Sequence, residues 1–398
     1  MPDMLFSKIS DKKNLFFFIY SSIKRKFIMK KTLIALAVIT MFSSAANAAV
    51  IYEKEGTKID IDGRMHFELR NDSGKRSDLQ DAGSRVRVRA FQEIGNGFST
   101  YGAVEFRFSK KDGSEQSIGS DLRAHRFFAG IKQKDIGELT FGKQLHLGDL
   151  VPKANYSYDL GANSFFDAHS KVAHFISVPF NGVRVSADYY FGNADSSKSS
   201  AISGASGETK ADEGKGYGFG VFYDGKFNGL NIRAGSAYTE VTHSSTGKKE
   251  DEFKLKRGGL GIDVKYSIVT FGIDWAFAKA GNKGNQKAES SRIGFQKIGG
   301  SVSGLTLNKN DRFLVGVKVD ATKQNAVYSE YYFGKGKKAN GDVVKMTGWA
   351  LGVDHRFTNN IAVYLEGGKG KVTDKDGKIL NKNGKSNRLV GLGVRMLF

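Results

Sequence analysis

The 398-residue sequence contains no cysteine and only three prolines. Without cysteine, neither a disulfide scaffold nor a thiolate metal site can form. The mean hydropathy of −0.36 argues against a protein that crosses a membrane with several helices, each of which needs about 20 consecutive apolar residues. Few prolines beside 49 glycines are typical of a chain made mostly of paired strands.

Hydrophobic residues make up 40% of the chain, and 30 phenylalanines and 15 tyrosines are among them. Such a content excludes a disordered chain. It is compatible with a transmembrane β-barrel, because barrel strands alternate apolar and polar residues and keep the average hydrophilic.

Residues 29–48 have the three parts of a secretory signal. Met29-Lys30-Lys31 is positively charged, residues 32–42 are apolar, and Ala46-Asn47-Ala48 supplies small residues for cleavage. We expect cleavage between Ala48 and Ala49, which leaves residues 49–398 as the barrel domain. Residues 1–28 have two interpretations, an overextended reading frame whose true start is Met29 or a long positive region of the signal.

Export also bears on the net charge, which is +20 for the whole chain. Removal of residues 1–48 takes away eight basic and two acidic residues, so the remaining chain carries +14. An exported protein has little access to nucleic acid, so we expect no nucleic-acid partner. The basic excess needs another explanation.

Strict alternation marks the segment from Lys58 to Arg70. Its odd positions carry Ile59, Ile61, Met65, Phe67 and Leu69, and its even positions are mostly charged. Strand geometry places these two sets on opposite faces. A face this rich in charge is typical of a wall that looks into a water-filled lumen.

The spacing of turns predicts the topology. Seven short turns alternate with eight long polar loops, which gives a 16-stranded antiparallel transmembrane β-barrel with both termini on the short-turn side. The short turns are 94–97, 135–137, 180–182, 224–229, 267–268, 320–324 and 358–360, and the loops are 71–83, 109–121, 147–169, 193–215, 242–252, 281–311, 335–343 and 372–386. Residues 281–311 leave an alternative open, since an extra hairpin there would give eighteen strands.

Aromatic residues recur near the expected strand ends, where they suit the two membrane interfaces. They are Tyr189, Phe191, Tyr331, Phe333, Trp349 and Phe357. The last strand, residues 389–398, alternates apolar residues and ends in Phe398.

Several stretches together make the sequence resemble the general porins of the Gram-negative outer membrane, closest to the Haemophilus and Pasteurella type. The stretches are residues 49–57, 128–132, 137–143, 352–357, 364–366 and the terminal strand. The resemblance implies a homotrimer of barrels in the outer membrane, each a water-filled channel for passive diffusion of ions and small hydrophilic solutes. It also implies that Phe398 is the signal read by the barrel assembly machinery, and Met396 departs from that signal's usual pattern.

The same resemblance implies a constriction where the third long loop, from His146 to His169, folds inward. The loop would present carboxylates across the lumen from a basic wall, although it has fewer acids than many members of the family. The expected acidic residues are Asp149, Asp159 and Asp167, and the basic residues expected by motif position are Arg85, His125 and Lys171. Arg87, Arg89 and Arg123 share lumen-facing parity and complete the expected basic side.

The arginines on one strand face support a selective role without the family. Arg85, Arg87 and Arg89 share a face, repel one another, and are tolerable only if wet or paired with carboxylates. In a narrow pore their field would attract anions. The alternative is a solvated face with no selective role. For the +14 charge, loop lysines facing anionic lipopolysaccharide are a second explanation.

No pattern indicates an enzyme. The seven histidines show no metal-ligand spacing, no G-x-S-x-G elbow occurs, and the glycine pairs lack a following helix pattern. We therefore expect no enzymatic activity, no cofactor and no metal. Two alternatives to a general channel stay open, a substrate-specific channel with eighteen strands and a barrel whose loops 193–215 and 372–386 act as adhesin or receptor surfaces.

Overall fold

The computed structural model describes residues 48–108, 118–119, 122–161, 165, 168–192, 214–244, 252–281, 302, 305, 307–338, 340–381 and 384–398. Residues 1–47, which hold the expected signal except for Ala48, lie outside the described residues, as does Asp167. No helix in the described ranges is long and apolar enough to cross a membrane.

The described chain is built from strands, with a single 3-10 helix, η1 (Leu147–Leu150). The strands are β1 (Ala49–Lys54), β2 (Thr57–Asp72), β3 (Asp78–Asp81), β4 (Arg85–Gly95), β5 (Phe98–Phe108), β6 (Leu122–Gln133), β7 (Gly137–Leu145), β8 (Ala168–Ser177), β9 (Val183–Tyr190), β10 (Lys215–Phe227), β11 (Leu230–Ser244), β12 (Glu252–Tyr266), β13 (Val269–Ala280), β14 (Lys309–Val319), β15 (Asn325–Lys337), β16 (Val343–Arg356), β17 (Ile361–Thr373) and β18 (Asn387–Leu397).

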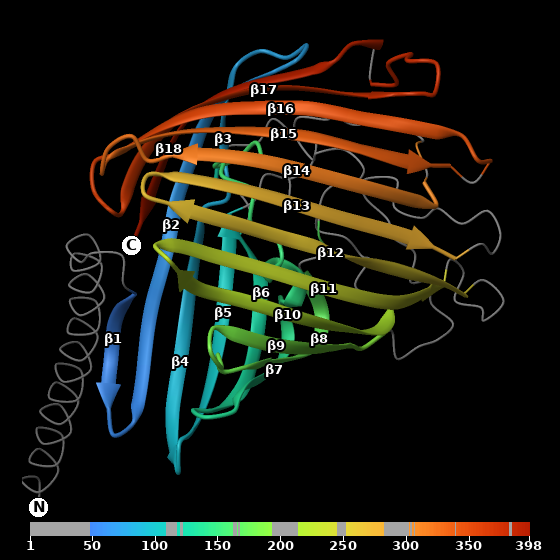
Figure 1. Ribbon diagram of the computed structural model, residues 1–398. Helices are drawn as coiled ribbons and strands as arrows, with labels where there is room; N and C mark the ends of the chain where they lie inside the picture. Colours follow the sequence, from blue (N-terminus) through green and yellow to red (C-terminus); the bar gives the residue numbers. More distant parts are fainter. Residues whose placement is uncertain are drawn as a thin grey trace, which may run out of the picture.

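Sixteen of these strands form a closed antiparallel ring, which confirms the predicted fold class (Figure 1). Each strand from β4 to β18 pairs with the next, β18 pairs with β2, and β2 pairs with β4. The seven predicted short turns all fall between consecutive ring strands. Because β13 pairs directly with β14 in the closed ring, the ring has sixteen strands, and the eighteen-strand alternative is wrong.

The two strands outside the ring count were not anticipated from the sequence. β3 lies in the first long loop and pairs with β2. β1 forms a hairpin with β2, and its Ala49 pairs with Ile61. Phe398, at the end of β18, exchanges backbone hydrogen bonds with Gly63 at 2.8 and 3.1 Å. β1 therefore continues the line of β18 along the same edge of β2.

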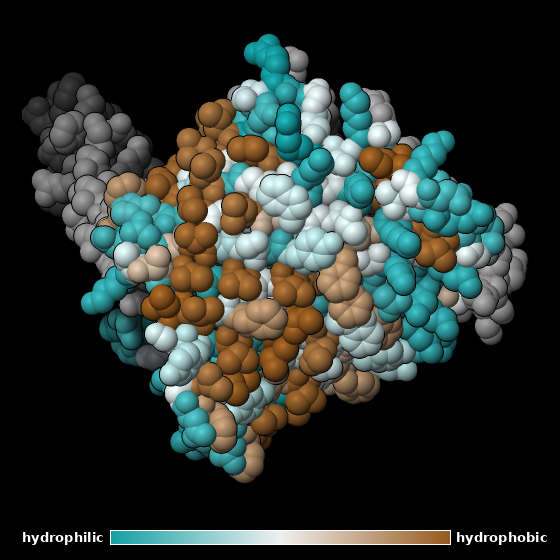
Figure 2. Space-filling model, turned by 45° about the horizontal axis from the view of Figure 1, so that its top comes forward, coloured by the Kyte–Doolittle hydropathy of each residue, from teal (hydrophilic) through white to brown (hydrophobic). Residues whose placement is uncertain are grey.

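Alternation along each strand separates an outer apolar face from a polar inner face. On β10, the side chains of Tyr217, Phe219 and Val221 are 44–59% exposed on the outer face. The side chain of Phe222 points into the barrel and is 3% exposed. The predicted strand-end aromatics also face outward, for example Trp349 at 47% and Phe357 at 57% exposure. Figure 2 shows the outward apolar side chains gathered in a brown band bordered by hydrophilic side chains. This is the surface that a lipid bilayer requires.

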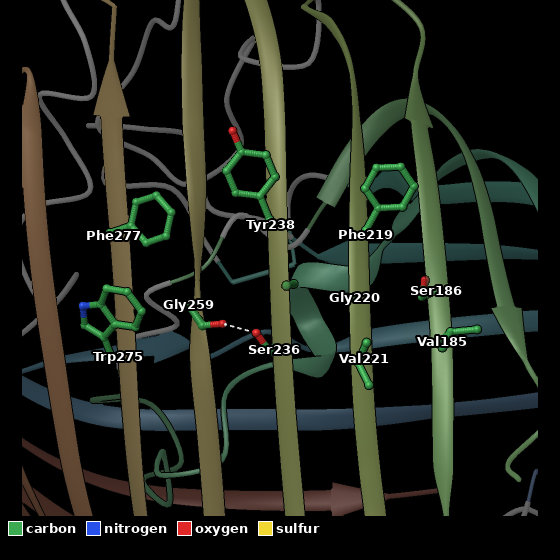
Figure 3. Close-up of a pocket in the computed structure, with 11 residues that line it drawn as sticks. Val185, Ser186, Phe219, Gly220, Val221, Ser236, Tyr238, Gly259, Trp275 and Phe277 are labelled. Atoms are coloured by element: carbon green, nitrogen blue, oxygen red, sulfur yellow. Dashed lines mark hydrogen bonds between the residues drawn. The ribbon is translucent and has the colours of Figure 1, made fainter.

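One groove in the outer band has a volume of about 510 Å³ and lies over β9 to β13 (Figure 3). Rings of Phe219, Tyr238, Trp275 and Phe277 surround it. At its floor the Ser236 hydroxyl donates to the carbonyl of Gly259 at 3.1 Å. The groove belongs to the lipid-facing surface and is separate from the barrel interior.

Candidate functional site

The third long loop, predicted from His146 to His169 and called L3 below, is attached through the backbone of its described residues 146–161 to the inner wall of the barrel. Asp274 on β13 accepts hydrogen bonds from the amides of Lys153 at 2.7 Å and Ala154 at 3.1 Å. Glu330 on β15 accepts from the amide of Ser157 at 2.6 Å. Wall carboxylates thus satisfy successive loop amides as the loop passes from strand to strand.

The same pattern continues at both ends of the loop. Glu366 on β17 accepts from the amides of Asp159 at 3.1 Å and Leu160 at 3.2 Å. At the start of the loop, Asp188 on β9 accepts from the amide of Leu147 at 3.2 Å. All four carboxylates are at least 95% buried, and a buried carboxylate must be matched by donors to be tolerated. L3 and its wall acids therefore require each other.

Apolar contacts, together with wall glycines that have no side chain, let the loop lie against the wall. Leu147 and Val151 are fully buried against Phe222 and neighbouring wall residues. A Cβ atom on Gly261 would lie 2.1 Å from the carbonyl oxygen of Val151, and one on Gly316 would lie 2.2 Å from that of Ala154. Glycine is needed there because the loop backbone occupies the space of a side chain.

Opposite the attached loop, the lumen face of β4 to β6 carries six arginines. Five of them, Arg85, Arg87, Arg89, Arg107 and Arg126, are called the arginine wall below, and the sixth is Arg123. Their side chains lie on the same face of the sheet as Asp60 and Asp62 of β2 and Glu105 of β5, and this face is turned toward the lumen. Nε of Arg89 lies 2.8 Å from Oδ1 of Asp60, and Nη2 of Arg87 lies 2.8 Å from Oδ2 of Asp62.

The remaining three arginines of the wall share one acid. Glu105 is 1% exposed. Its oxygens lie 2.8 Å from Nε of Arg107, 3.3 Å from Nη1 of Arg126 and 3.6 Å from Nη1 of Arg85. Five guanidinium groups thus face three carboxylates, and the wall keeps a positive excess. In a narrow lumen this excess attracts anions.

Not all of the predicted basic residues lie on the lumen wall. Arg85, Arg87 and Arg89 lie on the lumen wall as expected, and Arg123 pairs in register with Arg107 on the same face. His125 is the extra residue of an irregular step, because Glu105 pairs with Arg126 and Phe106 pairs with Ala124. The residue that meets Glu105 is therefore Arg126, which the sequence reasoning missed.

The prediction for Lys171 is wrong. Its side chain lies on the outer surface with Phe141, Tyr189 and Phe191, and its Nζ donates to the carbonyl of Gly192 at 2.7 Å. An irregular step in the pairing of β7 with β8 separates Gly142 from Gln144. The sequence gives no direct signal for this step.

The acidic residues of L3 lie near basic residues of the wall. Oδ2 of Asp159 is 2.9 Å from Nη1 of Arg70 on β2, and the carboxylate is 8% exposed. Asp149 lies in η1 and attracts Arg126 electrostatically. The loop also contributes a cation, Lys153. This residue interacts electrostatically with Arg233, Asp274 and Asp263 of the wall.

Lys153 was also missed by the sequence reasoning. Burial and the nearby guanidinium of Arg233 lower the pKa of its ammonium group, against the opposing effect of Asp274. Its Nζ donates to the carbonyl of Leu150. The only sequence feature that points to Lys153 is its position in the loop expected to narrow the pore.

The described part of the chain contains no cluster of three or more His, Asp or Glu side chains arranged to hold a metal ion. Asp188, Asp274, Glu330 and Glu366 accept hydrogen bonds from loop amides, and Asp60 and Glu105 pair with arginines. The interactions described are electrostatic. They hold a loop and a charged wall in place around a lumen.

A closed sixteen-strand barrel with an apolar outer band, a charged interior and an inward loop defines a channel protein of the outer membrane. A model of the Gram-negative porin family matches residues 35–375. The chain belongs to the Gram-negative porin family.

Similar proteins agree with this assignment. The major outer membrane protein of Pasteurella multocida strain Pm70 is 30% identical over 384 residues, which cover 93% of this chain and all of that protein. OmpT of Vibrio cholerae, in a trimer form, superposes with a TM-score of 0.61 at 16% identity and covers 86% of this chain and 100% of its own. An anion-selective porin from Comamonas acidovorans superposes with a TM-score of 0.60 at 15% identity, with coverage of 86% and 100%.

Proposed function

We propose that this outer-membrane porin is a passive diffusion channel for ions and small hydrophilic solutes that favours anions, and that it has no enzymatic activity. The positive excess of the arginine wall, which faces L3 across the lumen, carries this proposal. Fixed guanidinium groups raise the local concentration of anions and lower that of cations. Lys153 on the loop side adds to the same field.

The expected acidic side of the constriction is weaker than the basic side. Asp159 is matched by Arg70 at 2.9 Å, so its charge is largely compensated. A pore whose loop acids are compensated and whose wall keeps a positive excess is expected to prefer anions. The related structure from Comamonas acidovorans is described as anion-selective, which agrees with this direction.

The assembly proposed is a homotrimer with one pore in each subunit. The trimer form of Vibrio cholerae OmpT supports it, since a barrel of similar fold is present there. Export through the signal at residues 29–48, cleavage between Ala48 and Ala49, and recognition of Phe398 by the barrel assembly machinery complete the proposed route to the outer membrane. Lipopolysaccharide is the proposed lipid partner at the outer surface.

Single-channel recording of the mature protein in a planar bilayer tests the function. Closure in three equal steps is expected for the trimer, and a salt gradient should give a reversal potential whose sign shows anion preference. A reversal potential of the opposite sign would contradict the selectivity. Small steps blocked by a single sugar would contradict the general channel.

A further inference from the structure

The barrel interior contains an apolar cluster on the lumen face of β14 to β18, from the middle of these strands to their long-loop ends. The lumen face of a water-filled barrel is normally polar. Here the side chains of the wall part of the cluster are at most 2% exposed, so other residues must cover them from inside the barrel. The wall part consists of Leu314, Tyr332, Val344, Met346, Ala350, Val372 and Leu389.

Residues of two long loops provide this cover. Ala154 and Leu160 of L3 are fully buried in the cluster. Leu305 and Leu307, called the leucine pair below, precede β14 and are buried in the same cluster, and Val302 packs against it. L3 and the chain that leads into β14 therefore share one apolar core inside the barrel.

The leucine pair lies inside the barrel because the chain leaves the wall at Asn308. The amide of Asn308 donates to the carbonyl of Lys337 at 2.8 Å, and its carbonyl accepts from the amide of Ala280 at 2.8 Å. These bonds tie the start of β14 to both neighbouring strands. One residue earlier, Leu307 lies over the lumen face of β15, where a Cβ atom on Gly336 would overlap with its Cδ1 atom.

Leu160, near the tip of L3, is thus held by two different kinds of interaction. Its amide donates to Glu366 of the wall at 3.2 Å. Its side chain is fully buried in the cluster that the leucine pair completes. Removal of a buried leucine leaves a cavity that the surrounding structure fills only in part, so loss of the leucine pair would loosen the packing around Leu160.

We propose that Leu305 and Leu307 are positioning residues of the pore, which hold the tip of L3 against β14 to β18 and keep the lumen open in front of the arginine wall. The inference goes beyond the proposed function because it assigns pore width to residues that are buried away from the solute. It rests on that function, since the position of L3 sets conductance only in a channel. Without the leucine pair, the tip would leave the wall and move into the lumen.

The test uses the full mature protein and compares L305S/L307S with two controls. L305M/L307M keeps two apolar side chains of similar volume and should rescue the parent behaviour. L255S removes another buried leucine from the lumen face of the barrel, in the separate cluster of Phe253, Leu255 and Ala280. L307S is a milder variant that should show the same changes to a smaller degree if the double variant fails to fold.

Hydrogen exchange followed by peptide mass reports on L3 directly. We expect exchange at residues 158–160 to be about tenfold faster in L305S/L307S and equal to that of the parent in both controls. Exchange at the parent rate in the folded serine variants would overturn the proposal. Equal acceleration in L255S would overturn it as well, because the effect would then be a general loss of stability.

Single-channel recording shows whether the position of the tip sets the width of the pore. L305S/L307S should have a lower open conductance and more frequent closures than the parent, L305M/L307M and L255S. Faster exchange with unchanged conductance would overturn the proposed effect on the pore. The two measurements also separate this proposal from the proposed function, because a parent that conducts nothing would contradict the channel while hydrogen exchange still decides whether the leucine pair holds L3.

Discussion

Asp159 in L3 and Arg70 on β2 form an ion pair of 2.9 Å inside the barrel. The amide of Asp159 is held at the same time by Glu366 on β17 at 3.1 Å. One residue thus joins the loop to two strands that flank β18 in the ring. The position of the loop tip depends on both contacts.

Breaking this ion pair should release the tip. Removal of one partner of a buried ion pair costs about 3–5 kcal/mol where the other charge is left uncompensated. D159N should cost less than R70Q, because Arg70 keeps Asp72 at 3.3 Å. We expect R70Q and D159N each to increase current noise and change the open conductance in single-channel records. The double variant should change little more than either single variant, and fully additive effects would show that the two side chains act separately.

The wall carboxylates should act on separate stretches of L3. In E366Q an NH2 group replaces one oxygen of the side chain. The backbone amides of Asp159 and Leu160 then compete for fewer acceptor oxygens, which lowers the stability of the loop by about 1–3 kcal/mol. D274N should do the same to Lys153 and Ala154. Hydrogen exchange followed by peptide mass should show faster exchange at 158–160 in the first variant and at 153–154 in the second. Uniform loosening of the whole loop in both would contradict this division.

Gly316 offers a steric test of the loop position. A methyl group there would lie 2.2 Å from the carbonyl of Ala154, so G316A must displace L3 or strain the wall, at about 1–3 kcal/mol. The matched control is G367A, where the added Cβ meets nothing closer than 3.8 Å. We expect G316A to lower the thermal stability of the barrel and alter conductance, with both unchanged in G367A. Parent-like behaviour of G316A would place L3 elsewhere.

Replacing Arg85, Arg87 and Arg89 by glutamine should lower the anion preference. The three side chains belong to the positive excess of the wall, and the substitutions leave Asp60 and Asp62 without their partners. The reversal potential in a salt gradient should move toward cation preference. K171Q is the control because Lys171 lies on the outer surface, and its reversal potential should equal that of the parent. An unchanged reversal potential in the triple variant would remove the arginines from the selectivity.

The sequence was sufficient for the ring and for the arginine face, because both follow from alternation and turn chemistry. Arg87 shares a face with Arg89 whatever the strand pairs with. Lys171 was misplaced because it lies at an irregular step in the pairing of β7 with β8, which moves a side chain to the other face without any change in composition. His125 stands at a similar step of β6, where Arg126 takes the place opposite Glu105.

The attachment of L3 could not be read from the sequence. Asp274 and Glu366 bind loop amides more than 100 positions earlier in the chain. Nothing local distinguishes them from the other acids on lumen faces. Gly261 and Gly316 were the nearest signals, since a strand interior weakened by glycine marks a close backbone approach.

The end-to-end arrangement of β1 and β18 has a consequence for how the molecule forms. Phe398 bonds to Gly63 and β18 pairs with β2, so the seam of the cylinder joins strands from opposite ends of the barrel domain. The seam is the most non-local contact of the fold, and such contacts form late and slowly. The seam cannot form before β18 has been synthesised, so the cylinder closes only at a late stage of folding.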